Sequence, residues 1–335
     1  MTDSVYILKT MEQIETLCRN LIYGVAVGDA MGFPVQFYKR EQVKKFNITK
    51  MMAHFGGQIP AGTWSDDTSL TIALADALCD CDEIDYEKIM RNFYLWISEG
   101  KFTPYFKAFD IGPTCFKALM CYRGGDEPLL CGGNSELDNG NGSLMRISPL
   151  VIYIKNQLGD DAFDHKKTFE IIHNVSRLTH AHQIALVGCD IYIALLFYIL
   201  KGTEKKLALK IALDKVKCFV TRNKDFEYGF SKYQRLFDDN FSCLPETEIC
   251  SKGYVVYTLE AALWCFLSTD SYRECILKAV NLGNDTDTIG AVAGAMAGLY
   301  YAGQKDKSIS EDLISDLQGK DLLNNVVEKL VNKYK

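Results

Sequence analysis

The sequence carries no excess of positive charge, and this lack excludes one large class of function. Its 335 residues hold 37 Lys and Arg against 43 Asp and Glu, which gives a formal net charge of −6. A nucleic-acid-binding domain normally presents a basic face to the phosphate backbone. Lysines cluster at 205–210, but such a run is typical of a solvated helix face. We therefore expect no nucleic-acid partner.

The sequence also shows no signal-peptide pattern at residues 1–10 and no long uninterrupted apolar run. Residues 1–10 include Asp3 and no apolar core segment, so we expect no secretory signal. The longest apolar stretches, 184–200 and 289–301, contain an Asp or many Gly and Ala, and they are short for a membrane span. The 12 cysteines are spread singly along helical patterns, as reduced core thiols are. These features indicate a cytoplasmic protein without a membrane anchor.

No strand-like alternation, βαβ pattern or fixed repeat is visible, whereas apolar residues recur at helical spacing. We predict an all-α fold, built as one domain over 11–335 behind an extension of residues 1–10. The first helix is expected over 11–25, ending in the small-residue turn 28–32. Further helices are predicted over 86–97, within 168–200 (two helices), over 203–220, 253–267 and 272–280, and from 311 and 322.

The most informative stretch is 62–78, where Ser65, Asp66 and Asp67 stand at the head of an apolar run with helical spacing. One helix start needs only one capping acceptor, so the second carboxylate needs another reason. A second head of the same kind, 284–288, again precedes a helix of small apolar residues. Either head alone could be an ordinary cap with solvated acids. Two in one chain predict that they share a cation.

The nature of that cation follows from the donor atoms. A helix N-terminus favours a carboxylate by roughly 0.3 to 1 kcal/mol, which cannot offset the repulsion among four clustered carboxylates. The two heads offer Ser, Thr and Asp oxygens and neither Cys nor His. Oxygen-only sites favour hard ions, so Mg²⁺ or Mn²⁺ is expected rather than Zn²⁺.

Three further features lie outside the acidic heads. Asp110 precedes a predicted helix, and it is either a single cap or a functional acid. The turn 139–143 is either a plain tight turn or, before a helix, a cradle of backbone N–H groups for a phosphate. His180 and His182 are two residues apart and share no helix face, so a lone histidine in a pocket is favoured over a zinc pair.

The helix after the second acidic head repeats glycine at every fourth position, at Gly290, Gly294 and Gly298. This spacing leaves one helix face without side chains. In a membrane the pattern would favour helix dimerisation, but behind an acidic head we expect it to admit another core helix.

Six motifs in this order resemble the ADP-ribosylglycohydrolases, the family that includes the dinitrogenase reductase-activating glycohydrolase and the crystallin J1 relatives. The resemblance covers roughly residues 15–303. The motifs are Gly28-Asp29-Ala30-Met31-Gly32, Trp64-Ser65-Asp66-Asp67-Thr68, Asp110-Ile111-Gly112, Gly140-Asn141-Gly142-Ser143-Leu144-Met145-Arg146, Leu178-Thr179-His180 and Asp285-Thr286-Asp287-Thr288.

The resemblance implies a compact orthogonal bundle of helices with two Mg²⁺ or Mn²⁺ ions in a cleft, acting as a hydrolase that removes ADP-ribose from an acceptor. It implies catalytic roles for Asp110 and Asp67. The implied metal ligands are Ser65, Asp66, Asp67, Asp285, Asp287 and Thr288. The implied contacts to ADP-ribose are Gln36, the diphosphate cradle Gly140, Asn141, Gly142, Ser143, Leu144 and Met145, and then His180 and Tyr254.

Some positions depart from the family pattern. Gln36 stands where many members carry a titratable Glu, which argues against a serine-linkage mechanism and leaves protein arginine as the leading acceptor. The alternative is an inactive ADP-ribose-binding or structural, crystallin-like member of the same fold. Outside the family, a two-metal phosphoesterase would also use clustered acids. Ser65 replaces the commoner Thr, and Asn284 replaces a common Gly. We expect a monomer acting on an ADP-ribosylated protein or small molecule.

Overall fold

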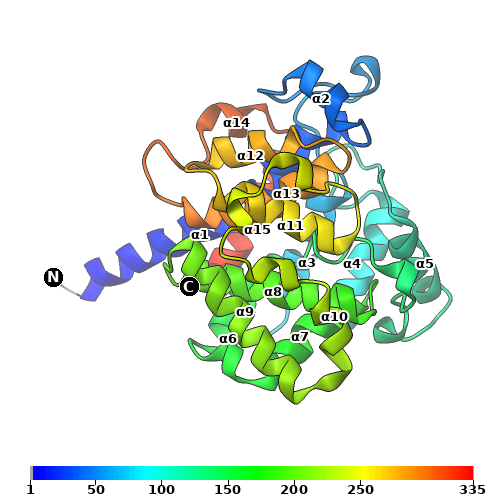
Figure 1. The fold of residues 1–335 in the computed structure, drawn as a ribbon, viewed down its shortest axis with the longest axis vertical. Coiled ribbons are helices and arrows are strands. Elements are labelled where there is room, and N and C mark those ends of the chain that lie inside the picture. Colours follow the sequence, from blue (N-terminus) through cyan, green and yellow to red (C-terminus); the bar gives the residue numbers. More distant parts are fainter. Residues whose placement is uncertain (1–2, 335) are drawn as a thin grey trace.

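The computed structural model describes residues 3–334, and within them the regular secondary structure is helical (Figure 1). Fifteen α-helices and nine short 3-10 helices account for its regular structure, with three isolated β-bridges and no strand in this range. The predicted all-α fold is confirmed. The 12 cysteines are all free thiols.

The helices predicted over 86–97, 168–200, 203–220, 253–267 and 272–280 are present as α4, α7 with α8, α9, α11 and α12. The α-helices are α1 (Asp3–Gly32), α2 (Arg40–Phe46), α3 (Asp66–Asp80), α4 (Tyr86–Glu99), α5 (Pro113–Arg123), α6 (Leu150–Leu158), α7 (Lys166–Arg177), α8 (Gln183–Leu200), α9 (Lys205–Arg222), α10 (Glu227–Ser231), α11 (Val255–Leu267), α12 (Tyr272–Val280), α13 (Thr286–Tyr300), α14 (Glu311–Asp316) and α15 (Lys320–Tyr334). The 3-10 helices are η1 (Phe33–Val35), η2 (Phe55–Gly57), η3 (Pro128–Leu130), η4 (Glu136–Asp138), η5 (Ala162–Asp164), η6 (Lys224–Phe226), η7 (Gln234–Phe237), η8 (Phe241–Cys243) and η9 (Glu246–Glu248).

The centre of the molecule is the contact between α1 and α13, which α3, α8, α11 and α12 surround (Figure 1). A Cβ on Gly28 would lie 2.0 Å from the carbonyl oxygen of Gly290, and one on Gly294 would lie 2.0 Å from that of Gly24. Neither face has room for any side chain, so the two backbones touch. The glycine stripe therefore admits another core helix, as predicted.

This contact also corrects the predicted end of the first helix. The sequence suggested that the helix ends in the small residues 28–32, but α1 continues through them to Gly32. Glycine in a helix interior costs up to about 1 kcal/mol relative to alanine. These positions are glycine because they face α13, where no side chain fits, and not because the chain turns there.

One helix of the described residues, α8, is long and apolar enough to cross a membrane by length and composition alone. In the folded chain 83% of that helix is buried within the protein. It therefore serves as a core helix, as an all-round apolar pattern favours.

Candidate active site

The first acidic head begins α3, and Ser65 is its N-cap. The Ser65 hydroxyl accepts the backbone N–H of Asp67 at 3.3 Å and donates to the Asp67 carboxylate at 3.0 Å. Asp66 and Asp67 are only 6% and 1% exposed. The cap is therefore present, but the two acids are not the solvated side chains that an ordinary cap would explain.

Asp29 in α1 fixes the position of this head, a role that the sequence did not reveal. Its carboxylate accepts the backbone N–H of Ser65 at 2.9 Å, the N–H of Thr68 at 3.0 Å and the Thr68 hydroxyl at 2.6 Å. These bonds satisfy donors at the start of α3 that would otherwise be unpaired. The only signal in the sequence was an acid between glycines in a helix that is otherwise apolar.

The second acidic head begins α13 and lies against the first. The Thr286 hydroxyl donates to the carbonyl of Gly32 at 2.8 Å, which ties this head to the end of α1. The Thr288 hydroxyl lies 3.4 Å from the carboxylate of Asp67 and donates to it. The two heads thus meet in space, although each belongs to a different part of the chain.

Asp110 joins the same group from a third segment and does not cap a helix. Gly112 is the N-cap of α5, and Asp110 has a left-handed backbone with φ of 61°. Burial raises the pKa of Asp110, and hydrogen bonds with Gln36 and Asp287 partly offset that effect. The interpretation of Asp110 as a single helix cap is therefore wrong.

Asp66, Asp110, Asp287 and Thr288 from these three segments line a cavity of about 290 Å³. Five of the predicted site residues do not line it, namely Ser65, Asp67, Ser143, Leu144 and Tyr254. The lining residues are Gln36, Phe37, Asp66, Asp110, Ile111, Gly112, Pro113, Thr114, Cys115, Gly140, Asn141, Gly142, Met145, His180, Gly253, Asp285, Asp287 and Thr288.

The charged side chains that line the cavity are all acidic. Asp66, Asp110, Asp285 and Asp287 line it, and none of the described lining residues is Lys or Arg. Burial, followed by repulsion from neighbouring carboxylates, raises the pKa of Asp66 and Asp287 well above the usual value. Burial likewise raises the pKa of Asp285 to about 6. A cation in the cavity would relieve this repulsion.

The donor set fits a hard divalent cation. Asp67 Oδ1 is buried and has no hydrogen-bond partner among the described residues, so it is free to bind an ion. The other oxygens nearby come from Ser65 and Thr288. Within residues 3–334, no three Asp, Glu, His or Cys side chains converge closely enough to hold a metal by themselves. Hydroxyl and water oxygens would have to complete the coordination, as is common for Mg²⁺.

The Gly140–Met145 turn forms another wall of the cavity, and the helix after it begins only at Leu150. It is therefore not the start of a helix, as a helix-terminus phosphate site would require. Asn141 donates its backbone N–H to the Gly253 carbonyl at 3.2 Å. Residues 142–144 are not helical, and among the described residues their backbone N–H groups donate to no backbone carbonyl. Buried Arg146 holds the turn by donating to the Gly142 carbonyl.

His180 lines the cavity beside this turn, whereas His182 does not. Burial and the nearby Arg146 charge lower the pKa of His180 to about 3, so its imidazole is neutral at pH 7. Its Nδ1 is 2.8 Å from the Thr179 hydroxyl. His182 instead accepts the Ile184 N–H as the N-cap of α8. The two histidines have separate surroundings, as their spacing predicted.

The geometry can now be compared with known proteins. Residues 11–335 match the family described as ADP-ribosylglycohydrolase. The chain belongs to this family. As a member of it, the protein is a hydrolase of glycosidic bonds.

Known members resemble this glycohydrolase over most of its length. It is 28% identical over 306 residues to the ADP-ribosylarginine hydrolase Tri1 of Serratia proteamaculans (strain 568), covering 89% of this chain and 77% of that protein. It is 27% identical over 281 residues to the ADP-ribosyl-(dinitrogen reductase) glycohydrolase of Rhodospirillum rubrum, covering 83% of each chain. A solved structure described as an ADP-ribosylglycohydrolase-related protein complex has a TM-score of 0.75 at 28% identity, covering 97% of this chain and 100% of that chain.

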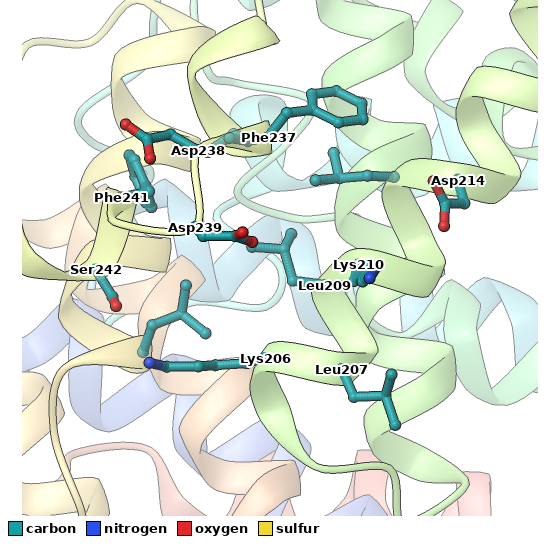
Figure 2. Close-up of a pocket in the computed structure, with 13 residues that line it drawn as sticks. Lys206, Leu207, Leu209, Lys210, Asp214, Phe237, Asp238, Asp239, Phe241 and Ser242 are labelled. Carbon is teal, nitrogen blue, oxygen red and sulfur yellow. The ribbon is translucent and has the colours of Figure 1, made fainter.

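This glycohydrolase has another hollow, of about 310 Å³, between α9 and the segment 236–242 (Figure 2). Leucine and phenylalanine side chains form much of its surface, and Lys206, Lys210, Asp214, Asp238 and Asp239 contribute charges. All five of these charged residues are solvent-exposed. The hollow therefore lacks the buried carboxylates that distinguish the acidic cavity, and we assign the chemistry to the latter.

Proposed function

We propose that this glycohydrolase removes ADP-ribose from arginine side chains of proteins, using two Mg²⁺ or Mn²⁺ ions. The observation that carries the proposal is the cavity lined by four carboxylates and no Lys or Arg. Such a cavity attracts divalent cations and a cationic guanidinium group, and repels competing anions unless metal is bound. The name of the similar ADP-ribosylarginine hydrolase supports the same acceptor.

ADP-ribose would lie along the cavity with its diphosphate on the Gly140–Met145 turn. The N–H groups of 142–144 that have no backbone acceptor would donate to phosphate oxygens. His180 is neutral, so it can donate a hydrogen bond without placing a buried positive charge there. Tyr254, beside the turn through its bridge to Gly140, would contact the adenosine part.

The ribose attached to the acceptor would then lie over the acidic heads. Ser65, Asp66, Asp67, Asp285, Asp287 and Thr288 would hold the ions. When bound, the ions would supply positive charge that orients the ribose hydroxyls and lowers the pKa of a water molecule. Asp67 does not line the cavity, and its buried Oδ1 has no hydrogen-bond partner among the described residues, so we assign it to holding an ion.

Hydrolysis breaks the bond between ribose C1″ and the guanidine nitrogen through an oxocarbenium-like transition state. Water attacks C1″, and the departing nitrogen needs a proton. Asp110 lines the cavity, and its carboxyl would carry that proton. The products are ADP-ribose and unmodified arginine. Gln36 hydrogen-bonds with Asp110 but cannot titrate, so in this scheme it orients the acid.

Gln36 also motivates the second candidate, a member that binds ADP-ribose without hydrolysing it. A direct test measures ADP-ribose released from ADP-ribosyl-arginine and ADP-ribosyl-serine peptides, each with Mg²⁺, Mn²⁺ or EDTA. We expect metal-dependent release from the arginine peptide. No release from either peptide, together with measurable ADP-ribose binding, would replace the proposal by the second candidate. An Asp110→Asn variant should bind ADP-ribose and release at least 100-fold less product.

A further inference from the structure

One aromatic side chain that lines the acidic cavity makes no ring–ring contact with the other described residues. Phe37 is 74% exposed, and it lines the cavity. A large apolar side chain contributes little to stability when its ring remains in water. Its neighbour Gln36 is buried and hydrogen-bonds with Asp110, so the backbone of Phe37 directly follows a residue held beside that acid.

The backbone at Phe37 is held in an unfavourable conformation. Its φ is 65°, in the left-handed region that bulky residues rarely adopt. Asn284, just before the second acidic head, is also left-handed with φ of 63°. The two segments are joined by reciprocal bonds, because Phe37 N–H donates to the Asn284 carbonyl at 2.5 Å and Asn284 N–H donates to the Tyr38 carbonyl at 2.7 Å.

This strain is a reason to look for a function. Residues forced into sparsely populated conformations concentrate at binding and catalytic sites, where the surrounding structure maintains them. Other residues also have positive φ, but Phe37 combines it with an exposed ring and a place in the cavity wall. The backbone hydrogen bonds to Asn284 hold the segment that carries this ring beside the second acidic head.

The position of Phe37 indicates which part of a substrate it would meet. Gly142 and His180 both line the part of the cavity assigned to ADP-ribose, and a Cβ on Gly142 would lie 2.9 Å from His180 Cε1. Gln36 hydrogen-bonds with Asp110, the acid proposed to protonate the departing group. Phe37 follows Gln36, so it lies on the side where the acceptor leaves.

We propose that Phe37 is a specificity-determining residue whose ring stacks on the guanidinium group of the acceptor arginine. The inference rests on the proposed function. A guanidinium is planar, delocalised and weakly hydrated, and it stacks on aromatic faces more readily than an ammonium does. The surrounding carboxylates would keep the acceptor cationic, and Phe37 would orient its plane.

The first test compares steady-state kinetics of wild type and Phe37→Ala on an ADP-ribosyl-arginine peptide. Loss of an exposed cation–π contact predicts that KM rises about two- to five-fold, while the inhibition constant of free ADP-ribose does not change. Phe37→Tyr should restore the wild-type KM. An unchanged KM in Phe37→Ala, or a parallel rise in the ADP-ribose inhibition constant, would overturn the proposal.

Two further variants separate recognition from folding. Phe37→Gly relieves the left-handed strain, so its Tm should equal or exceed that of wild type while its KM matches that of Phe37→Ala. Phe46→Ala removes an exposed aromatic that packs edge-on against Tyr38 and does not line the cavity. This control should keep the wild-type KM. A wild-type KM in Phe37→Gly would contradict the proposed contact between the ring and the acceptor.

The proposal can be decided even if the wild-type protein proves inactive on arginine. Calorimetry would then compare binding of the intact ADP-ribosyl-arginine conjugate with binding of ADP-ribose. Tighter binding of the conjugate that Phe37→Ala abolishes would support the stacking contact and refute only the proposed turnover. Equal affinities for both ligands in the wild type would overturn the contact.

Discussion

The hydroxyl of Thr288 lies 3.4 Å from the carboxylate of Asp67, a residue 221 positions earlier in the chain. This contact joins the start of α13 to the start of α3. It brings two groups of buried carboxylates together without any cationic side chain on the cavity wall. Without a cation, repulsion among these carboxylates lowers the stability of the fold, and the first prediction tests that effect.

Replacing Asp66 and Asp287 by Asn should have opposite effects on activity and on stability without metal. Turnover should fall at least 100-fold, because two ion ligands are lost. The metal-free variant should melt at least about 2 °C higher than metal-free wild type, because buried like charges are removed.

Wild type at a metal concentration of 100 times Kd should gain about 2.7 kcal/mol of unfolding free energy, and the variant should gain much less. Thermal melts with EDTA, Mg²⁺ and Mn²⁺ measure both effects, with exposed Asp214→Asn as the control. Full activity in the double variant would refute the assigned ligands.

Asp29→Ala should weaken metal binding although Asp29 does not line the cavity. The substitution leaves the N–H groups of Ser65 and Thr68 without their acceptor, which costs about 1 to 3 kcal/mol. The start of α3 would then be poorly fixed, and the metal-induced rise in Tm should shrink. Asp85→Ala is the matched control, because Asp85 caps α4 by accepting the Lys88 N–H at 3.0 Å. That variant should lose about 1 kcal/mol and retain the full response to metal. Equal metal responses in both variants would contradict a positioning role for Asp29.

Gly28→Ala should destabilise the protein even though alanine is the better helix former by about 1 kcal/mol. The new Cβ would lie 2.0 Å from the Gly290 carbonyl oxygen, so α1 and α13 would have to separate. We expect a loss of about 3 kcal/mol or more, read from the midpoint of urea unfolding. Gly188→Ala in α8 is a milder comparison, because its Cβ would meet the Tyr233 side chain and not a backbone atom. If Gly28→Ala is as stable as wild type, the two backbones are not in contact.

His180→Gln should change how stability depends on pH. Burial lowers the folded-state pKa of His180 to about 3, whereas an unfolded histidine titrates near 6.5. Between these values the unfolded state binds the extra proton, so His180 costs stability as pH falls from about 6.5 towards 3. The slope is up to about 1.4 kcal/mol per pH unit. Relative to wild type, the variant should therefore lose less stability over that window in chemical denaturation. If the stability of wild type and variant depends on pH in the same way, the pKa of His180 does not differ between the folded and unfolded states, which would contradict the prediction.

The local features of this chain could be predicted from its sequence. Helical periodicity and the Ser65 cap depend on residues within a few positions of one another, and α3, α7, α8 and α11 follow the predicted pattern. The glycine stripe of α13 predicted a close contact with another helix, because a helix face without side chains allows a second backbone to approach. The clustered oxygens of both heads predicted a common site, and the fold brings them together.

The tertiary structure alone decided how the other site residues are used. Asp110 was expected as a possible cap, yet its partners are Gln36 and Asp287, which no local pattern reveals. Asn141 donates its N–H to Gly253, a residue far along the chain, so the turn offers fewer donors than its sequence suggested. The strain at Phe37 likewise comes from hydrogen bonds to Asn284. Short-range propensities fix helices and caps, whereas these roles arise from contacts between distant segments that exist only after α1 and α13 have packed together.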